Sequence, residues 1–171
     1  MIFNPPEELL KVIRFKDVRM ELTLPTFNDV EKYGWVSMMF FAAVRDFFRV
    51  DATRRHIDPD ILFVFSNPII NAAEHGNRWD EEKEIKVGLW FGEGGILFGI
   101  KDEGDFYTQQ PVKVGVEARI PFSSTSTRER EFGTPGDGMK HIYYKADHII
   151  VDTEQGVLYL VLMTTSIIEE D

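Results

Sequence analysis

The sequence contains no cysteine among its 171 residues. This absence excludes disulfide bonds, thiolate metal sites and a cysteine nucleophile, and it fits a reducing compartment such as the cytoplasm. Basic residues are also scarce: 19 Lys and Arg stand against 29 Asp and Glu, for a formal net charge of −10. A protein that follows a nucleic-acid backbone needs the opposite bias, so the sequence predicts no nucleic-acid partner.

Long apolar runs are absent as well. The longest stretches, such as "VSMMFFAAV" and "ILFVF", fall far short of the roughly 20 residues that a membrane-spanning helix requires. The first residues lack the basic start and cleavable apolar core of a signal peptide. No repeat or low-complexity segment divides the chain, so we expect one cytoplasmic domain over residues 1–171 with no membrane contact.

Helices are predicted where apolar residues recur every three or four positions or where capping residues occur together. Asp58-Pro59-Asp60 is the strongest such start, because a capping carboxylate, a proline and a second negative charge all suit a first helical turn. The expected helices are "NPPEELLKVI", residues 29–48, the helix that follows Asp58, and a short helix after Gly138.

Strands are predicted where polar and apolar residues alternate or where short apolar runs lie between turn residues. The expected strands are residues 17–24, 84–91, 95–101, 148–152 and 157–165, with "GEGG" closing a hairpin. Because helices and strands do not alternate regularly, the pattern predicts an α+β fold. We expect a two-layer sandwich with a mixed, mostly antiparallel sheet and helices on one face.

Three segments place polar residues or glycines at the ends of regular elements. In "NPIINAAEHGNRWD", Asn67, Asn71 and His75 recur every four residues, which aligns them on one side of a helix. In "KDEGDF", Asp102 follows an apolar strand and Gly104 permits a close backbone turn. In "GTPGDGMK", glycines lead into a helix start, where free N–H groups favour anions.

These segments, in this order and at these separations, resemble the N box and two glycine boxes of the GHKL ATP-binding superfamily. That superfamily includes gyrase, heat-shock chaperones, histidine kinases and mismatch-repair ATPases. The leading strand "RMELTLP", the long helix, the "HG" after the asparagine and the lack of a phosphoacceptor domain are most similar to the anti-sigma-factor serine/threonine protein kinases. The resemblance covers about residues 17–165 and implies a histidine-kinase-like ATPase fold that binds ATP and magnesium.

The resemblance implies roles for individual residues at the base and metal end of the site. Asn71 matches the asparagine that coordinates magnesium through its carbonyl oxygen, the kind of ligand that magnesium prefers. Asp102 matches the aspartate that accepts a hydrogen bond from the adenine amino group, and Gly104 matches the glycine beneath the base. Considered alone, Asn71 is also typical of a buried core amide, and Asp102 of a solvated carboxylate at a strand end.

At the phosphate end, the resemblance assigns the second glycine box to Gly136 and Gly138, and we place Met139 beside them in the nucleotide site. Backbone N–H groups there would hold the phosphates. Residues 107–135 would form a lid, although "STREREFG" within them is equally typical of an exposed charged loop.

The sequence also departs from the family pattern. A glutamate that activates the attacking hydroxyl is replaced by Asn67, and an amide cannot accept a proton near neutral pH. Asp105-Phe106 replaces a glycine, and Asp105 and Asp137 add negative charge near the expected phosphates. Pro68 lies inside the predicted helix, where proline tends to cause a kink.

Two further features have structural interpretations. His75 is expected to cap its helix, because a transition-metal site would need a second histidine at a suitable spacing. The cluster Met38-Met39-Phe40-Phe41 is expected in the core, although part of it could contribute to a dimer or partner surface.

The resemblance predicts a regulator of transcription that works by partner switching. Such a protein binds a sigma factor or an anti-anti-sigma antagonist, and the nucleotide decides which; an active member transfers the γ-phosphate to a serine of its partner. Because Asn67 replaces the base, we expect phosphotransfer to be weakened or lost. The alternative is a non-catalytic GHKL-fold interaction module that needs no nucleotide. Formation of a homodimer is left open.

Overall fold

The computed structural model describes residues 2–48, 55–104, 142, 145–152 and 154–170. Within them the fold is α+β, as predicted, and its main sheet has five antiparallel strands in the order β1-β3-β4-β6-β5. The strands are β1 Phe15–Pro25, β3 Glu84–Gly92, β4 Gly95–Lys101, β5 His148–Asp152 and β6 Val157–Met163.

The helices are α1 Glu7–Val12, α2 Val30–Phe48, α3 Ile61–Asn71 and the short α6 Thr164–Ile167, and a π-helical turn, η1 Ala72–Gly76, continues α3. A separate two-stranded sheet pairs β2 Arg55–Ile57 with β7 Ile168–Glu170. The sequence did not predict this small sheet, because three-residue strands are too short to show an alternating pattern.

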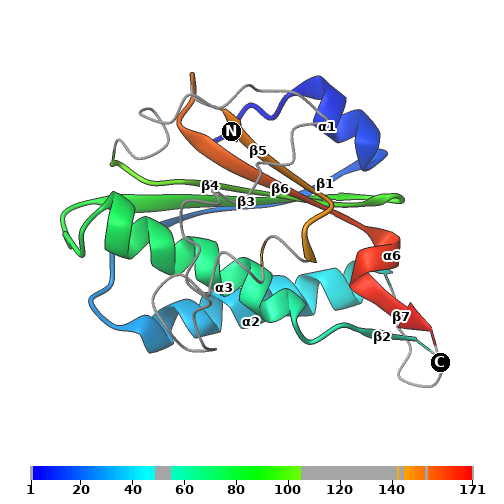
Figure 1. The fold of residues 1–171 in the computed structure, drawn as a ribbon, viewed down its shortest axis with the longest axis horizontal. Coiled ribbons are helices and arrows are strands. Elements are labelled where there is room, and N and C mark those ends of the chain that lie inside the picture. Colours follow the sequence, from blue (N-terminus) through cyan, green and yellow to red (C-terminus); the bar gives the residue numbers. More distant parts are fainter. Residues whose placement is uncertain (1, 49–54, 105–141, 143–144, 153, 171) are drawn as a thin grey trace, which may run out of the picture.

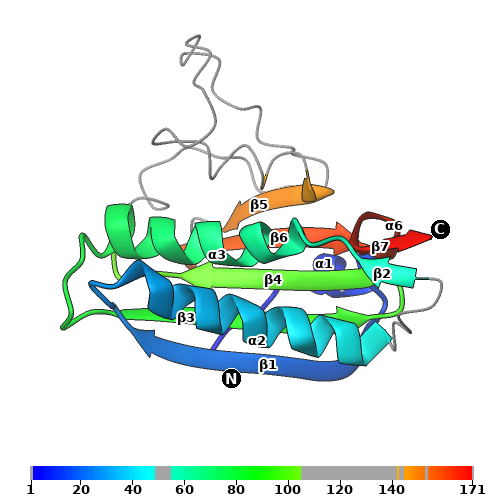
Figure 2. The same ribbon diagram turned by 90° about the horizontal axis from the view of Figure 1, so that it is seen from below.

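The helices form layers against the main sheet (Figure 1). The long helices α2 and α3 cover one face as predicted, and α1 lies on the opposite face (Figure 1). Figure 2 shows α2 near the β1 side of the sheet and α3 nearer to β6. None of the helices within the described residues combines the length and the apolar character needed to cross a membrane.

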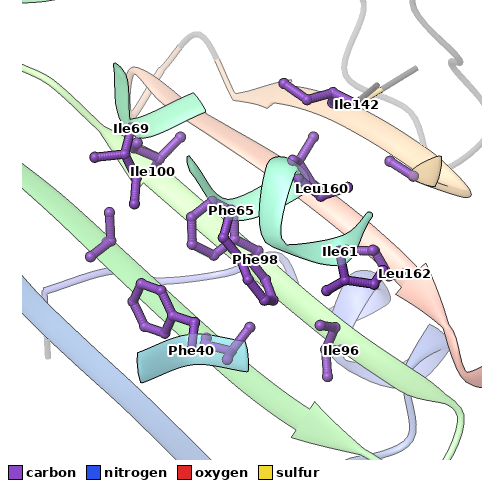
Figure 3. Packing of buried hydrophobic residues seen from close by; sticks show 14 of the residues in the cluster. Phe40, Ile61, Phe65, Ile69, Ile96, Phe98, Ile100, Ile142, Leu160 and Leu162 are labelled. Atoms are coloured by element: carbon purple, nitrogen blue, oxygen red, sulfur yellow. The ribbon is translucent and has the colours of Figure 1, made fainter. Parts of the chain in front are cut away.

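The larger core lies between the sheet and the two long helices. At its centre, the ring of Phe65 on α3 lies 5.3 Å from that of Phe98 on β4, and Phe40 on α2 lies 5.7 Å from both. Ile69 and Ile100 extend this packing toward the C-terminal end of β4 (Figure 3). The core therefore holds α3 against β4, which sets the positions of two of the three predicted site segments, the N-box segment on α3 and the first glycine box after β4.

A second apolar cluster lies on the face covered by α1. There, Gly88 and Gly99 are paired on neighbouring strands, and a Cβ on Gly88 would lie 2.3 Å from the ring of Trp90. The indole therefore occupies the space that the two glycines leave. Phe3 and Tyr159 pack on it, with ring centroids at 5.5 and 6.4 Å.

The prediction for the methionines of α2 was wrong. Phe40 is fully buried, but the side chains of Met38 and Met39 are 51% and 46% exposed, and that of Trp35 is 77% exposed. Met38 and Met39 follow Trp35 by three and four residues, so the three lie together on a side of α2 that is turned away from Phe40. We call these three residues the α2 patch.

Candidate nucleotide site

The start of α3 is fixed by charge and hydrogen bonding, as the sequence predicts. The buried carboxylate of Asp58 accepts the backbone N–H of Asp60 at 2.9 Å. Lys145 forms an ion pair with Asp58, and its Nζ lies 3.8 Å from a carboxylate oxygen of Asp60. These contacts connect the helix start to the segment that leads into β5, which limits how α3 can shift along the sheet.

Asn67 and Asn71 both lie on α3 and are partly buried. The helix continues through Pro68, whose ring is buried although it cannot donate a hydrogen bond to the carbonyl of Val64. Proline therefore does not end the helix here, and the two asparagines remain one α-helical turn apart, on one side of α3.

The helix then widens into the π turn. The N–H of Asn77 donates to the carbonyl of Ala72 at 2.7 Å, and the N–H of Trp79 donates to that of Ala73 at 2.8 Å. The last turn of the helix, which contains His75, is therefore π-helical, whereas Asn67 and Asn71 lie on the α-helical part.

His75 is exposed in the π turn, and its side chain forms no hydrogen bond within the described part of the chain. The capping role predicted for His75 is therefore not observed. The turn is instead closed by the backbone and by the next polar residue, Asn77.

The end of the N box and the first glycine box are in direct contact. A Cβ on Gly76 would lie 2.2 Å from Cγ of Asp102, and a Cβ on Gly104 would lie 2.3 Å from the carbonyl oxygen of Gly76. Only glycine allows these two backbones to approach so closely. The structure therefore brings together two segments that lie about 25 residues apart in the sequence.

Asp102 lies at this junction and is only 5% exposed. Its Oδ1 accepts the backbone N–H of Gly104 at 2.8 Å, which orients the carboxylate. The interpretation of Asp102 as a solvated strand-end residue is therefore wrong. A buried carboxylate of this kind can accept a hydrogen bond from an amino group that enters the junction, as the role implied for it requires.

The sequence did not identify Asn77, which holds the junction together. It is fully buried, and its Nδ2 donates to Oγ1 of Thr26 at 2.7 Å and to the carbonyl of Glu84 at 3.0 Å. Its Oδ1 accepts the N–H of Glu103 at 2.8 Å. One amide thus joins the helix end, the segment before α2, the start of β3 and the exit from β4. Asn77 follows Gly76 directly in the sequence, and this position after the end of a helix was the feature from which its role could have been predicted.

The other predicted site residues lie outside the described residues. These are Gly136, Gly138, Met139, the lid at 107–135, and the departures Asp105, Phe106 and Asp137. Of the residues that the resemblance assigns to the nucleotide or to magnesium, the structure thus describes only Asn71, Asp102 and Gly104.

No group of three or more His, Cys, Asp or Glu side chains in the described part of the chain could hold a metal ion. Magnesium at Asn71 would be held by an amide oxygen together with nucleotide phosphates, so this finding does not test it. The donors present, an amide oxygen and a buried carboxylate, fit the adenine and metal end of an ATP–magnesium complex.

Neither models of known protein families nor curated proteins match this sequence. The resemblance to ATP-binding proteins is therefore a resemblance of the three sequence segments alone.

Proposed function

We propose that this protein is a cytoplasmic, ATP- and magnesium-binding regulator of the anti-sigma serine/threonine kinase type. It acts by partner switching, and its phosphotransfer activity is weakened or lost. Its protein partner is a sigma factor or an anti-anti-sigma antagonist.

The observation that carries the proposal is the junction of Gly76, Asp102 and Gly104. Asp102 and Gly104, the two residues that the resemblance places at the adenine, both approach Gly76 at the end of the N-box segment, and the carboxylate is buried and oriented. A carboxylate that is buried and held in one orientation can accept a directed hydrogen bond, which supports the proposed contact with the adenine amino group.

Each residue has a distinct part in the proposed site. Asp102 accepts the adenine amino group, and Asn71 offers its side-chain carbonyl oxygen to magnesium. The bound ATP supplies the transferable phosphoryl group. Asn67, one turn before Asn71, can hydrogen-bond to a water or hydroxyl but cannot take its proton.

The first test is calorimetry of the protein with ATP and magnesium. Wild-type protein should bind, and Asp102→Asn should bind at least about tenfold more weakly, because a hydrogen bond to a charged group contributes about 1.5–3 kcal/mol. Asp152→Asn is the matched control. Asp152 is also a buried strand-end aspartate that accepts backbone N–H groups, at 3.0 and 2.9 Å, but it extends toward the α1 face. No heat at millimolar ATP would reject nucleotide binding.

A second function, a protein-binding module without catalysis, is favoured by the α2 patch and by the amide at Asn67. Three large apolar side chains exposed on one side of a helix are typical of a protein-contact surface. Under this alternative the fold is kept as a platform, and nucleotide is dispensable.

Asn67→Glu separates a weakened kinase from a platform. Restoring a proton acceptor one turn before Asn71 should raise phosphate release or transfer at least about tenfold, a conservative part of the general-base range. Asn71→Ala, which removes the proposed magnesium ligand, serves as the negative control for phosphate release and transfer. Brisk turnover by the wild type would mean that another residue is the base. No gain in a variant that binds ATP would favour the platform.

A further inference from the structure

A row of four paired residues crosses the main sheet on the face that α1 covers. Glu21 on β1 pairs with Gly88 on β3, and Tyr159 on β6 pairs with Gly99 on β4. The two glycines pair with each other. Directly paired residues point to the same face of a sheet, so a carboxylate and a phenol flank the two glycines on this face.

Two buried oxygen atoms in this row have no hydrogen-bond partner among the described residues. They are the hydroxyl of Tyr159, whose side chain is fully buried, and Oε1 of Glu21. Burial raises the pKa of the Tyr159 hydroxyl, and the charges of Asp152 and Glu21 raise it further, so both carboxylates lie near it. The row therefore offers hydrogen bonds that the described part of the chain does not use.

Three residues, Ile2, Phe3 and Asn4, lie over the row, and we call them the strap. The N–H of Ile2 donates to Oε2 of Glu21 at 2.9 Å, and the carbonyl of Asn4 accepts a hydrogen bond from Nε2 of Gln155 at 3.1 Å. Both hydrogen bonds are exposed, so water can replace them at little cost in free energy. The polar contacts alone would hold the strap weakly.

The ring of Phe3 is the buried part of the strap. It is 3% exposed and meets the ring of Trp90 edge-on, with the centroids 5.5 Å apart. A Cβ on Gly88 would lie 3.0 Å from Cδ2 of Phe3, so the ring occupies space above that glycine. The strap thus places an aromatic ring and an N–H donor side by side on the row.

This pair of groups indicates what else the row can bind. The strap gives Glu21 one N–H donor, whereas an ammonium group carries three and can satisfy the second oxygen as well. A positive charge is also favoured near two carboxylates and beside aromatic rings. An aromatic ring joined to an ammonium group by a short chain therefore fits the row better than the strap does.

We propose that the α1 face carries a binding site for a small aromatic ammonium compound, with the strap as its internal competitor. The ammonium group donates hydrogen bonds to Glu21 and to the hydroxyl oxygen of Tyr159, and the ring replaces that of Phe3 beside Trp90. The strap opens when the compound binds. The site lies on the opposite face of the sheet from α3, which carries Asn71, so it is separate from the proposed nucleotide site (Figure 1).

Phenethylammonium chloride is the probe, because it joins a phenyl ring to an ammonium group. In calorimetry without nucleotide, wild-type protein should bind it with a Kd of about 1–10 mM, as expected for a ligand of this size that must displace the strap. Phe3→Ala removes the competing ring and should bind at least about tenfold more tightly. Phenethyl alcohol, the uncharged counterpart, should bind both proteins at least about tenfold more weakly.

Two substitutions in the row test the polar contacts, each combined with Phe3→Ala. Glu21→Gln should weaken probe binding at least about tenfold, and Tyr159→Phe at least about threefold, because a hydrogen bond to a charged group contributes more than one to a neutral group. The matched control is Glu8→Gln, the same change at an exposed position of α1, which should leave the affinity unchanged. Thermal unfolding verifies that each variant is folded.

Nuclear magnetic resonance shows where the probe binds, because the sequence contains only three tryptophans. The indole N–H signal of Trp90, assigned with Trp90→Phe, should shift when the probe is added. The signals of Trp35 and Trp79 should not. Trp35 belongs to the exposed α2 patch, so its signal is the control for non-specific contact with apolar surface.

Several outcomes would overturn the proposal. The first is no heat from wild-type protein at tens of millimolar probe. The second is equal affinity of Phe3→Ala for the ammonium and the alcohol, which would mean that the substitution only created an apolar cavity. The others are an affinity that Glu21→Gln does not change and a shift at Trp35 in place of Trp90. None of these measurements requires nucleotide, so the result is independent of the proposed ATP site.

Discussion

Gly76 lies where the π turn at the end of α3 touches the end of β4. Its neighbours Asp102 and Gly104 leave no room for a side chain, since a Cβ on Gly76 would lie 2.2 Å from a carboxylate carbon. The sequence shows Gly76 as a helix end, but the reason for a glycine is the close approach to another segment. That reason depends on tertiary contacts that the local pattern does not contain.

Gly76→Ala should destabilise the fold by about 1–3 kcal/mol, because Asp102 or the helix end must shift to make room for the added methyl group. Gly34→Ala is the matched control in α2, where an added Cβ meets nothing within 4 Å. It should stabilise the protein by about 1 kcal/mol, since alanine favours a helix interior. Urea unfolding of both variants checks this, and equal effects would contradict the crowding at Gly76.

Helix α2 shows how an element can be predicted correctly while its orientation is not. Its extent matches the prediction to within one residue at its start. The run Met38-Met39-Phe40-Phe41, however, places apolar residues on all sides of the helix, so periodicity does not decide which of them face the sheet. Contacts with Phe65 and Phe98 select Phe40 for the core and leave the methionines outside.

The α2 patch should therefore tolerate polar substitution. Met38→Gln combined with Met39→Gln should change the free energy of unfolding by no more than about 0.5 kcal/mol, as is usual for exposed positions. Phe40→Ala on the same helix should cost about 3–5 kcal/mol. Chemical denaturation measures both. A large loss in the methionine variant would mean that these side chains are covered in solution.

The helical segment that begins with α3 ends at Gly76, as the sequence indicates, but the π geometry of its last turn was not predicted. Its start follows from local chemistry, because Asp58 accepts a backbone N–H two residues later. Its end depends on the π turn and on Asn77, whose partners come from three other segments. The sequence pattern around α3 does not predict a hydrogen bond from Asn77 to Thr26, which lies 51 positions earlier in the chain.

For the whole molecule, burial of tyrosine predicts how stability depends on pH. Desolvation raises the pKa of the fully buried Tyr159, with nearby Asp152 and Glu21 adding to the effect, and burial also raises that of Tyr33. The neutral hydroxyl is thus favoured in the folded state. This stabilisation is complete below the unfolded pKa near 10 and is lost as pH rises above it toward the folded pKa.

Tyr159→Phe should reduce that alkaline loss. The Tyr159 hydroxyl has no hydrogen-bond partner among the described residues, so its removal should change stability little at pH 7. Between pH 7 and about pH 11, the variant should lose less free energy of unfolding than the wild type. Urea denaturation at the two pH values makes the comparison, and identical losses would show that Tyr159 does not titrate with unfolding.

The sequence by itself determined the elements whose signals are local: the long helices, the strands of the main sheet, the capped start of α3 and the α+β class. It also placed Asn71, Asp102 and Gly104 at the ends of elements. Hydrophobic periodicity and turn chemistry depend on neighbouring residues, so they can be recognised without a structure.

Only the tertiary structure decided which segments meet. It joined Gly76 to Asp102 and Gly104, buried Asn77 among four segments, turned the α2 patch outward and left β1 at an edge of the sheet. These features arise from contacts between residues far apart in the sequence. The free energy of such contacts depends on how whole elements pack, and no local pattern contains that information.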